Sequence, residues 1–125
     1  MNIVISNAGG TPIYEQIFAQ IKAAILSGEL KEGDALPSMR LLARELRVSV
    51  ITTKRAYEEL ERAGFIVSMT GRGSFVAGVG AELLREQHLQ HIESLLLEAL
   101  KEAALCGLSE GEFIELLRTL APWRE

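Results

Sequence analysis

The sequence has a single cysteine, no long apolar run and no spacing typical of a metal site. Cys106 cannot form an intrachain disulfide, and no C-x-x-C or H-E-x-x-H pattern occurs in the 125 residues. No apolar stretch approaches the roughly 20 residues that a membrane span needs, and the first residues, MNIVISNAGG, lack the pattern of a signal peptide. We therefore expect a soluble, cytoplasmic protein that is one compact domain, or a small domain with an appendage.

Positive charge is concentrated in one part of the chain, although the formal net charge is -4. Residues 1–76 contain nine Lys or Arg and eight Asp or Glu, whereas residues 77–125 contain four and nine. Within residues 38–57 there are five basic residues and one acidic residue. A local excess of positive charge therefore marks this stretch.

The first helix is predicted between Thr11 and Gly28. Thr11 suits the N-cap, Pro12 suits the first helical position and Gly28 suits the end of the helix. Apolar residues recur between them at helical spacing: Ile13, Ile17, Ile21, Ala24 and Ile25. The following residues are too rich in glycine and charge to continue the helix, although Leu30 and Leu36 could anchor a short strand.

Two further helices are predicted with only Arg47 and Val48 between them. Ser38 suits the N-cap of the earlier helix, and Ser49 suits the N-cap of the later helix, which ends at Gly64. The apolar face of the earlier helix has helical spacing and consists of Met39, Leu42, Ala43 and Leu46. Two helices joined by so tight a turn are typical of a helix-turn-helix.

After Gly64 the periodicity changes from helical to strand-like. The runs FIVSM and SFVAG are apolar and favour strands, and TGRG between them supplies glycines for a tight reversal. These residues predict a β-hairpin with Arg72 at its tip. Three helices followed by a hairpin with a basic tip predict a winged helix-turn-helix.

The third predicted helix has two different sides on a helical wheel. One side is expected to pack and consists of Thr53, Ala56, Tyr57, Leu60 and Ala63. The other side is expected to be exposed and consists of Ile51, Lys54, Arg55, Glu58 and Arg62. A helix N-terminus with hydroxyl groups, at Ser49 and Thr52, followed by cations is suited to DNA phosphates and base edges.

Simpler roles remain open for several of these residues. Ser49 and Thr52 could serve only to cap the helix, and its cations could be ordinary solvated surface. Ile51 could meet a thymine methyl group or pack beneath the hairpin. Arg72 could be a plain turn residue or could reach the minor groove.

The sequence between Gly28 and Val76 resembles the DNA-binding domain of GntR-type bacterial transcription regulators. The motifs that carry the resemblance are, in chain order, G-x-L-x-x-G-x-x-LPS-x-R, LA-x-x-L-x-VS, T-x-x-x-AY-x-x-L and G-x-G-x-F-V. The resemblance implies DNA contacts from Ser38, Arg40, Ser49, Thr52, Lys54, Thr70, Gly71 and Arg72. The helical wheel adds Ile51 and Arg55 to this predicted DNA-binding set. Val50 and Ile51 stand where other members have polar or basic residues, which bears on base specificity.

About fifty residues follow the hairpin, too few for the large effector or aminotransferase-like domains of other branches of that family. The chain therefore resembles the short YtrA-like branch. A helix is predicted over residues 81–104, with a coiled-coil-like seam at Leu89, Ile92, Leu96, Ala99 and Ala103. Gly107 ends this helix, and Ser109 and Glu112 form a predicted capping box for a last helix.

The two C-terminal helices carry more leucine than they can hide against each other. They could fold back on the winged domain, but a symmetric operator requires a two-fold protein, so we expect a homodimer. The predicted dimer contacts are Leu89, Ile92, Leu96, Leu100, Phe113, Leu116, Leu117 and Leu120. The two recognition helices would then lie about 34 Å apart along the duplex.

Together these patterns predict a mainly α chain with a small β-hairpin (α+β). Residues 1–78 are expected to form a winged helix-turn-helix DNA-binding domain, and residues 79–125 a C-terminal helical hairpin used for dimerisation. We expect a sequence-specific transcription regulator, acting as a repressor, that binds a two-fold symmetric operator in double-stranded DNA as a homodimer. The alternative is a winged-helix adaptor that binds protein and no DNA.

Enzymatic, metal and cofactor chemistry is not expected. No nucleophile, base and orienting group can be assembled from the sequence. His88 and His91 lack an evident third ligand for a metal, and Cys106 is expected to be a small buried residue. An unidentified small-molecule effector is left open, although no pocket for one can be read from the residues.

Overall fold

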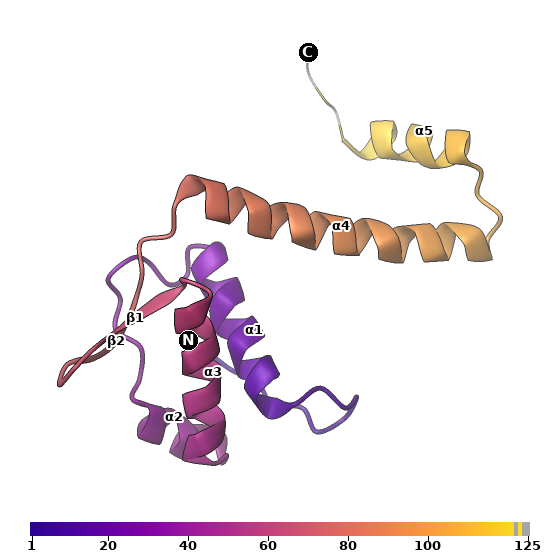
Figure 1. Cartoon of the computed structure of the whole chain (residues 1–125). Helices are drawn as coiled ribbons and strands as arrows, with labels where there is room; N and C mark the ends of the chain where they lie inside the picture. Colours follow the sequence, from indigo (N-terminus) through magenta and orange to yellow (C-terminus); the bar gives the residue numbers. More distant parts are fainter. Residues whose placement is uncertain (122, 124–125) are drawn as a thin grey trace. The chain divides into compact units, whose positions relative to one another are not determined.

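The computed structural model describes residues 1–121 and 123. The chain divides into two compact units, Met1–Ala81 and Glu82–Glu125. In chain order the elements are α1 (Ile13–Leu26), α2 (Met39–Leu46), α3 (Val50–Arg62), β1 (Ile66–Met69), β2 (Gly73–Val76), α4 (Ala81–Leu105) and α5 (Glu110–Leu120) (Figure 1). The prediction of a mainly α chain with a small β-hairpin is confirmed.

Two predictions near α1, the first residue of the helix and a short strand after it, need correction. Pro12, rather than Thr11, is the N-cap, because Pro12 has an extended backbone with φ -55° and ψ 146°. The end of the helix is as predicted, since Gly28 follows it in the left-handed conformation at φ 84°. Downstream, the predicted short strand is only a single bridge, which pairs Ala35 with Phe75.

The core of the first unit lies between α1, α3 and the hairpin. Its most deeply buried large side chains are Ile17, Ile21, Thr53, Tyr57, Leu60, Phe65 and Ile66. Burial raises the pKa of Tyr57 well above its ordinary value, so the phenol stays protonated and donates to the Pro37 carbonyl at 2.7 Å. The Thr53 hydroxyl is shared between the Met39 carbonyl at 3.0 Å and the Val50 carbonyl of its own helix at 2.9 Å. The hydrogen bonds to Pro37 and Met39 hold the segment that begins α2 against α3.

The predicted helix-turn-helix is present in the described residues. Ser38 and Ser49 cap α2 and α3, as predicted. Between the helices Arg47 takes the left-handed conformation at φ 58°, which lets the chain reverse within two residues. The packing side of α3 is buried as predicted except for Ala63, which is exposed because it lies at the C-cap, beyond the last helical residue.

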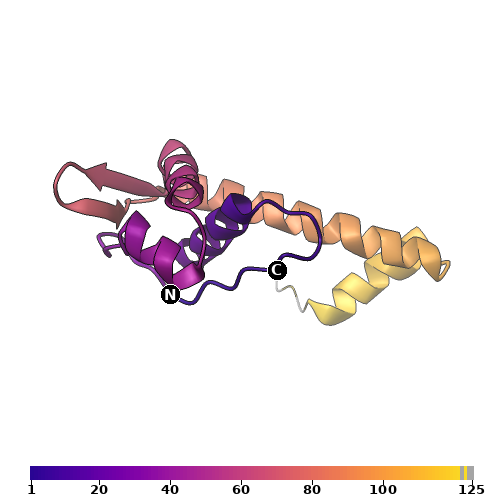
Figure 2. The same ribbon diagram turned by 90° about the horizontal axis from the view of Figure 1, so that it is seen from below.

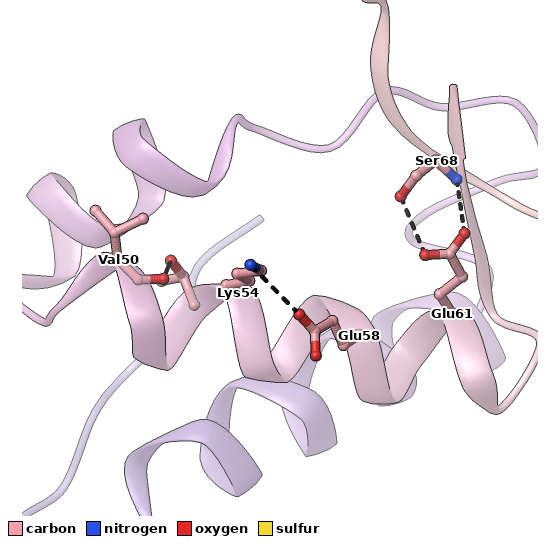
Figure 3. A network of polar contacts seen from close by, with 6 residues as sticks. Val50, Lys54, Glu58, Glu61 and Ser68 are labelled. Carbon is pink, nitrogen blue, oxygen red and sulfur yellow. Dashed lines mark hydrogen bonds and ion pairs between the residues drawn. The ribbon is translucent and has the colours of Figure 1, made fainter. Parts of the chain in front are cut away.

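The predicted hairpin is confirmed and is tied to α3. β1 and β2 pair antiparallel, with Ile66 opposite Val76, and the hairpin projects beyond the three helices of its unit (Figures 1 and 2). Ser68 of β1 donates from its N–H and from its hydroxyl to the carboxylate of Glu61 on α3, at 3.4 and 3.3 Å (Figure 3). Polar contacts as well as core packing therefore fix the hairpin beside α3.

The second unit contains two helices with almost no fully buried side chains. Among the described residues, Ala103 is the only buried side chain of α4 and α5. The predicted capping box is confirmed, because Ser109 and Glu112 each accept the other's backbone N–H, at 3.2 and 3.0 Å. Cys106 is exposed, contrary to expectation, because it follows the end of α4. No helix in the described part of the chain is long and apolar enough to cross a membrane.

Candidate nucleic-acid interface

The N-terminus of α3 presents the two predicted hydroxyl groups. Ser49 accepts the N–H of Thr52 at 3.1 Å, and the two hydroxyl oxygens lie 2.8 Å apart. Both residues therefore do serve as part of the helix cap. Only one of their two hydroxyl hydrogens is used between them, so the other remains available to an external acceptor such as a phosphate oxygen.

Beyond these hydroxyl groups, α3 has the predicted exposed side. Ile51 is 80% exposed, so packing beneath the hairpin, one of its two alternatives, is excluded. The side chain of Lys54 is 63% exposed, and its Nζ lies 4.0 Å from a carboxylate oxygen of Glu58 (Figure 3). An exposed ion pair of this length contributes little, so Lys54 can turn to a stronger anion at small cost.

The start of α2 and strand β2 border the same end of α3. A shallow pocket of about 310 Å³ is lined by Pro37, Ser38, Met39, Arg40, Val50, Tyr57, Gly73 and Ser74. Ser38 accepts the N–H of Leu41 at 3.1 Å as the cap of α2, whereas Arg40 is exposed. The fold thus brings Ser38 and Arg40 together with the N-terminus of α3.

The predicted residues of the hairpin tip lie apart from this pocket. Thr70, Gly71 and Arg72 are exposed and lie in the turn between the strands, outside the residues that line the pocket. The N–H of Arg72 donates to the Met69 carbonyl at 2.9 Å, and Gly71 has φ 77°. The turn therefore needs glycine at position 71 and leaves the Arg72 side chain at the tip.

Most cations of residues 38–72 have no acidic partner. Among the described residues, the ion pairs use Lys54, Arg62 and Arg118. The cations of residues 38–72 that remain outside these pairs are Arg40, Arg44, Arg47, Arg55 and Arg72. Exposed and uncompensated positive charge of this kind is suited to the phosphate backbone of a nucleic acid.

Sequence reasoning missed a contact between Arg55 and Tyr14 of α1. The guanidinium carbon of Arg55 lies 3.8 Å from the centroid of the Tyr14 ring, so the two groups stack. Arg55 is therefore exposed, as predicted, but also restrained. No local pattern could have revealed this contact, because it depends on how α1 packs against α3.

Known proteins resemble the chain along much of its length. The family model described as "Bacterial regulatory proteins, gntR family" matches residues 13–76. The HTH-type transcriptional repressor YtrA of Bacillus subtilis (strain 168) is 34% identical over 119 residues, which cover 95% of this chain and 92% of that protein. A GntR family transcriptional regulator from Listeria monocytogenes is 27% identical, with a TM-score of 0.72 over 92% of this chain and 98% of that chain. AraR(DBD) in complex with operator ORX1 is 25% identical, with a TM-score of 0.55 over 62% of this chain and 96% of that chain.

Proposed function

Because this chain belongs to the gntR family of bacterial regulatory proteins and is a DNA-binding transcription regulator, we propose that it is a repressor that binds a two-fold symmetric operator as a homodimer. The observation that carries the proposal is the exposed positive charge around the start of α3, where Arg40, Arg55 and Arg72 form no ion pair among the described residues, on a helix whose other side is fixed in the core. The chain is a regulator rather than an enzyme, as predicted, and the adaptor alternative is not favoured, since its relatives are named as transcription regulators. We place it in the cytoplasm, where a bacterial operator lies.

In the proposed complex, α3 enters the major groove with its N-terminus leading. Contacts to bases and to the phosphates beside them come from Ser49, Ile51, Thr52, Lys54 and Arg55. Ser38 and Arg40 grip the adjacent backbone, and the hairpin tip at 70–72 lies along the minor groove. The shared pocket at the starts of α2 and α3 supports one continuous contact there, and the hairpin tip supplies a second.

We assign DNA binding to residues 1–78 and dimerisation to residues 79–125. The proposed dimer contacts on α4 and α5 are apolar, and most are between 42% and 73% exposed in a single chain: Leu89, Ile92, Leu96, Leu100, Leu116, Leu117 and Leu120, with Phe113 partly buried. Two helices with Ala103 as their one buried side chain among the described residues have no core of their own. A second copy can supply the missing half of that core.

The test begins with selection of duplexes from a randomised pool by the full chain. Fluorescence anisotropy on the enriched duplex then gives the affinity at several salt concentrations. Arg40→Ala and Lys54→Ala should each weaken binding and lower the slope of log affinity against log salt by about 0.9, because each removes a phosphate contact. Lys101→Ala is the matched control, since it removes an exposed cation of α4 and should leave affinity nearly unchanged. No enriched duplex, or equal losses in all three variants, would contradict the assignment.

A further inference from the structure

We propose that Tyr14 is a positioning residue of the DNA-binding surface, which holds Arg55 ready for a backbone phosphate. The inference rests on the proposed function, and it adds a residue of α1 to a surface otherwise built from α2, α3 and the hairpin. Tyr14 is partly buried near the start of α1, and Arg55 lies on the exposed side of α3 next to Lys54.

The contact between the two side chains is a close stack. The Cζ atom of Arg55 lies 3.8 Å from the centroid of the Tyr14 ring. By comparison, the Nζ atom of Lys22 lies 5.8 Å from the centroid of the Phe18 ring, near the outer limit of a cation–π contact. The Tyr14 hydroxyl donates to the exposed Glu15 carboxylate at 3.1 Å, so the ring, rather than the hydroxyl, is the part of Tyr14 that contacts Arg55.

The stack leaves the hydrogen-bond donors of Arg55 unused. A guanidinium carries its five N–H donors in its own plane, so contact with a ring occupies only its face. Within the described part of the chain Arg55 forms no ion pair, and the carboxylates three and four residues after it on α3 have other partners, Glu58 with Lys54 and Glu59 with Arg62. A restrained guanidinium with free donors is suited to a bidentate contact with a phosphate.

Restraint of Arg55 should raise the affinity for DNA. A long arginine side chain loses rotamer freedom when it grips a phosphate, and a ring that already restrains it reduces that loss. The strength of an exposed cation–π contact corresponds to roughly a two- to fivefold change in affinity. Loss of the ring removes the restraint but not the charge, so the number of neutralised phosphates, and with it the salt slope, should stay the same.

The experiment measures affinity for the enriched duplex by fluorescence anisotropy at several salt concentrations, with the full chain. Arg55→Ala should weaken binding and lower the salt slope by about 0.9. Tyr14→Leu should weaken binding roughly two- to fivefold at an unchanged slope, whereas Tyr14→Phe, which retains the ring, should bind as the wild type does. In the Arg55→Ala background, Tyr14→Leu should have no further effect. Phe18→Leu changes another aromatic residue of α1 and is the matched control, with affinity expected to stay the same.

Thermal melting of each variant separates positioning from folding, and Tyr14→Met is a second ringless variant should Tyr14→Leu not fold. The proposal is overturned if a ringless variant that melts like the wild type also binds as tightly. It is equally overturned if removal of the Tyr14 ring weakens binding by the same factor in the Arg55→Ala background as in the wild type. Both results leave the DNA-binding function standing, because wild-type affinity is measured in the same series. Failure of the wild type to bind any duplex is the separate result that would remove that function.

Discussion

Replacement of thymine by uracil in the operator tests whether Ile51 reads a base. Deoxyuridine lacks only the C5 methyl group of thymidine, so the hydrogen-bonding groups in the major groove stay the same. Ile51 is 80% exposed in the first turn of α3, the part of a recognition helix that reaches base edges. Contact between an apolar side chain at this place and a methyl group lowers the free energy of the complex, because both groups leave water.

The expected magnitude follows from the burial of one methyl group. Such burial contributes about 0.8 kcal/mol, which corresponds to about a fourfold change in Kd. A symmetric dimer presents Ile51 twice, so replacement in both half-sites should weaken binding about 15-fold. Ile51→Ala should change the free energy of unfolding by less than about 0.5 kcal/mol, because the side chain is exposed, so a loss of binding would not reflect misfolding.

The assay is competition against the labelled enriched duplex, with each thymine replaced by deoxyuridine singly and in symmetric pairs. The wild type should bind more weakly when one particular thymine in each half-site is replaced, whereas Ile51→Ala should bind the thymine and uracil duplexes with equal affinity. A uracil outside the enriched sequence serves as the control. If no thymine shows the effect, or if Ile51→Ala responds as strongly as the wild type, Ile51 does not read a methyl group.

Three further predictions concern folding and assembly. Thr53→Val should lower the free energy of unfolding in urea by about 1 kcal/mol, because the carbonyls of Met39 and Val50 lose the hydroxyl that they share, and an unchanged value would show that these bonds do not stabilise the fold. Leu96→Glu should convert the expected dimer to a monomer in sedimentation at micromolar concentration, while the control Glu98→Gln should not, and a persistent dimer would place the interface elsewhere. The capping bonds lower the pKa of Glu112, so their contribution is present above the ordinary carboxyl pKa and is lost as pH falls through the lowered value. Helicity measured by circular dichroism from about pH 6 to about pH 3 should therefore fall further in the wild type than in Glu112→Gln, and equal losses would contradict this role.

The boundaries of α2 and α3 were predictable because their caps are encoded locally. Ser38 and Ser49 carry the side chains that satisfy the first N–H groups of a helix, and Gly64 supplies the left-handed residue after α3. Pro12 was placed wrongly for a physical reason. Its ring fixes φ at a value that suits both the N-cap and the first helical position, and only ψ, set by the path of the chain, distinguishes them.

The exposed side of α3 was also predictable, but the contacts of its side chains were not. Periodicity assigned Ile51 to that side and left two roles open, and only the position of the hairpin in the folded chain separates them. The stack of Arg55 on Tyr14 joins residues far apart in the sequence. Such a contact depends on the packing of α1 against α3, which no local spacing encodes.

Two copies of α3 bound to one duplex are the central feature proposed for this protein. Hydroxyl-radical footprinting of the enriched duplex, with the number of chains per duplex measured in the same buffer, tests it most directly. We predict two chains per duplex and two protected segments, related by two-fold symmetry, with centres about 34 Å apart. A single protected segment bound by one chain, or protection without two-fold symmetry, would contradict it.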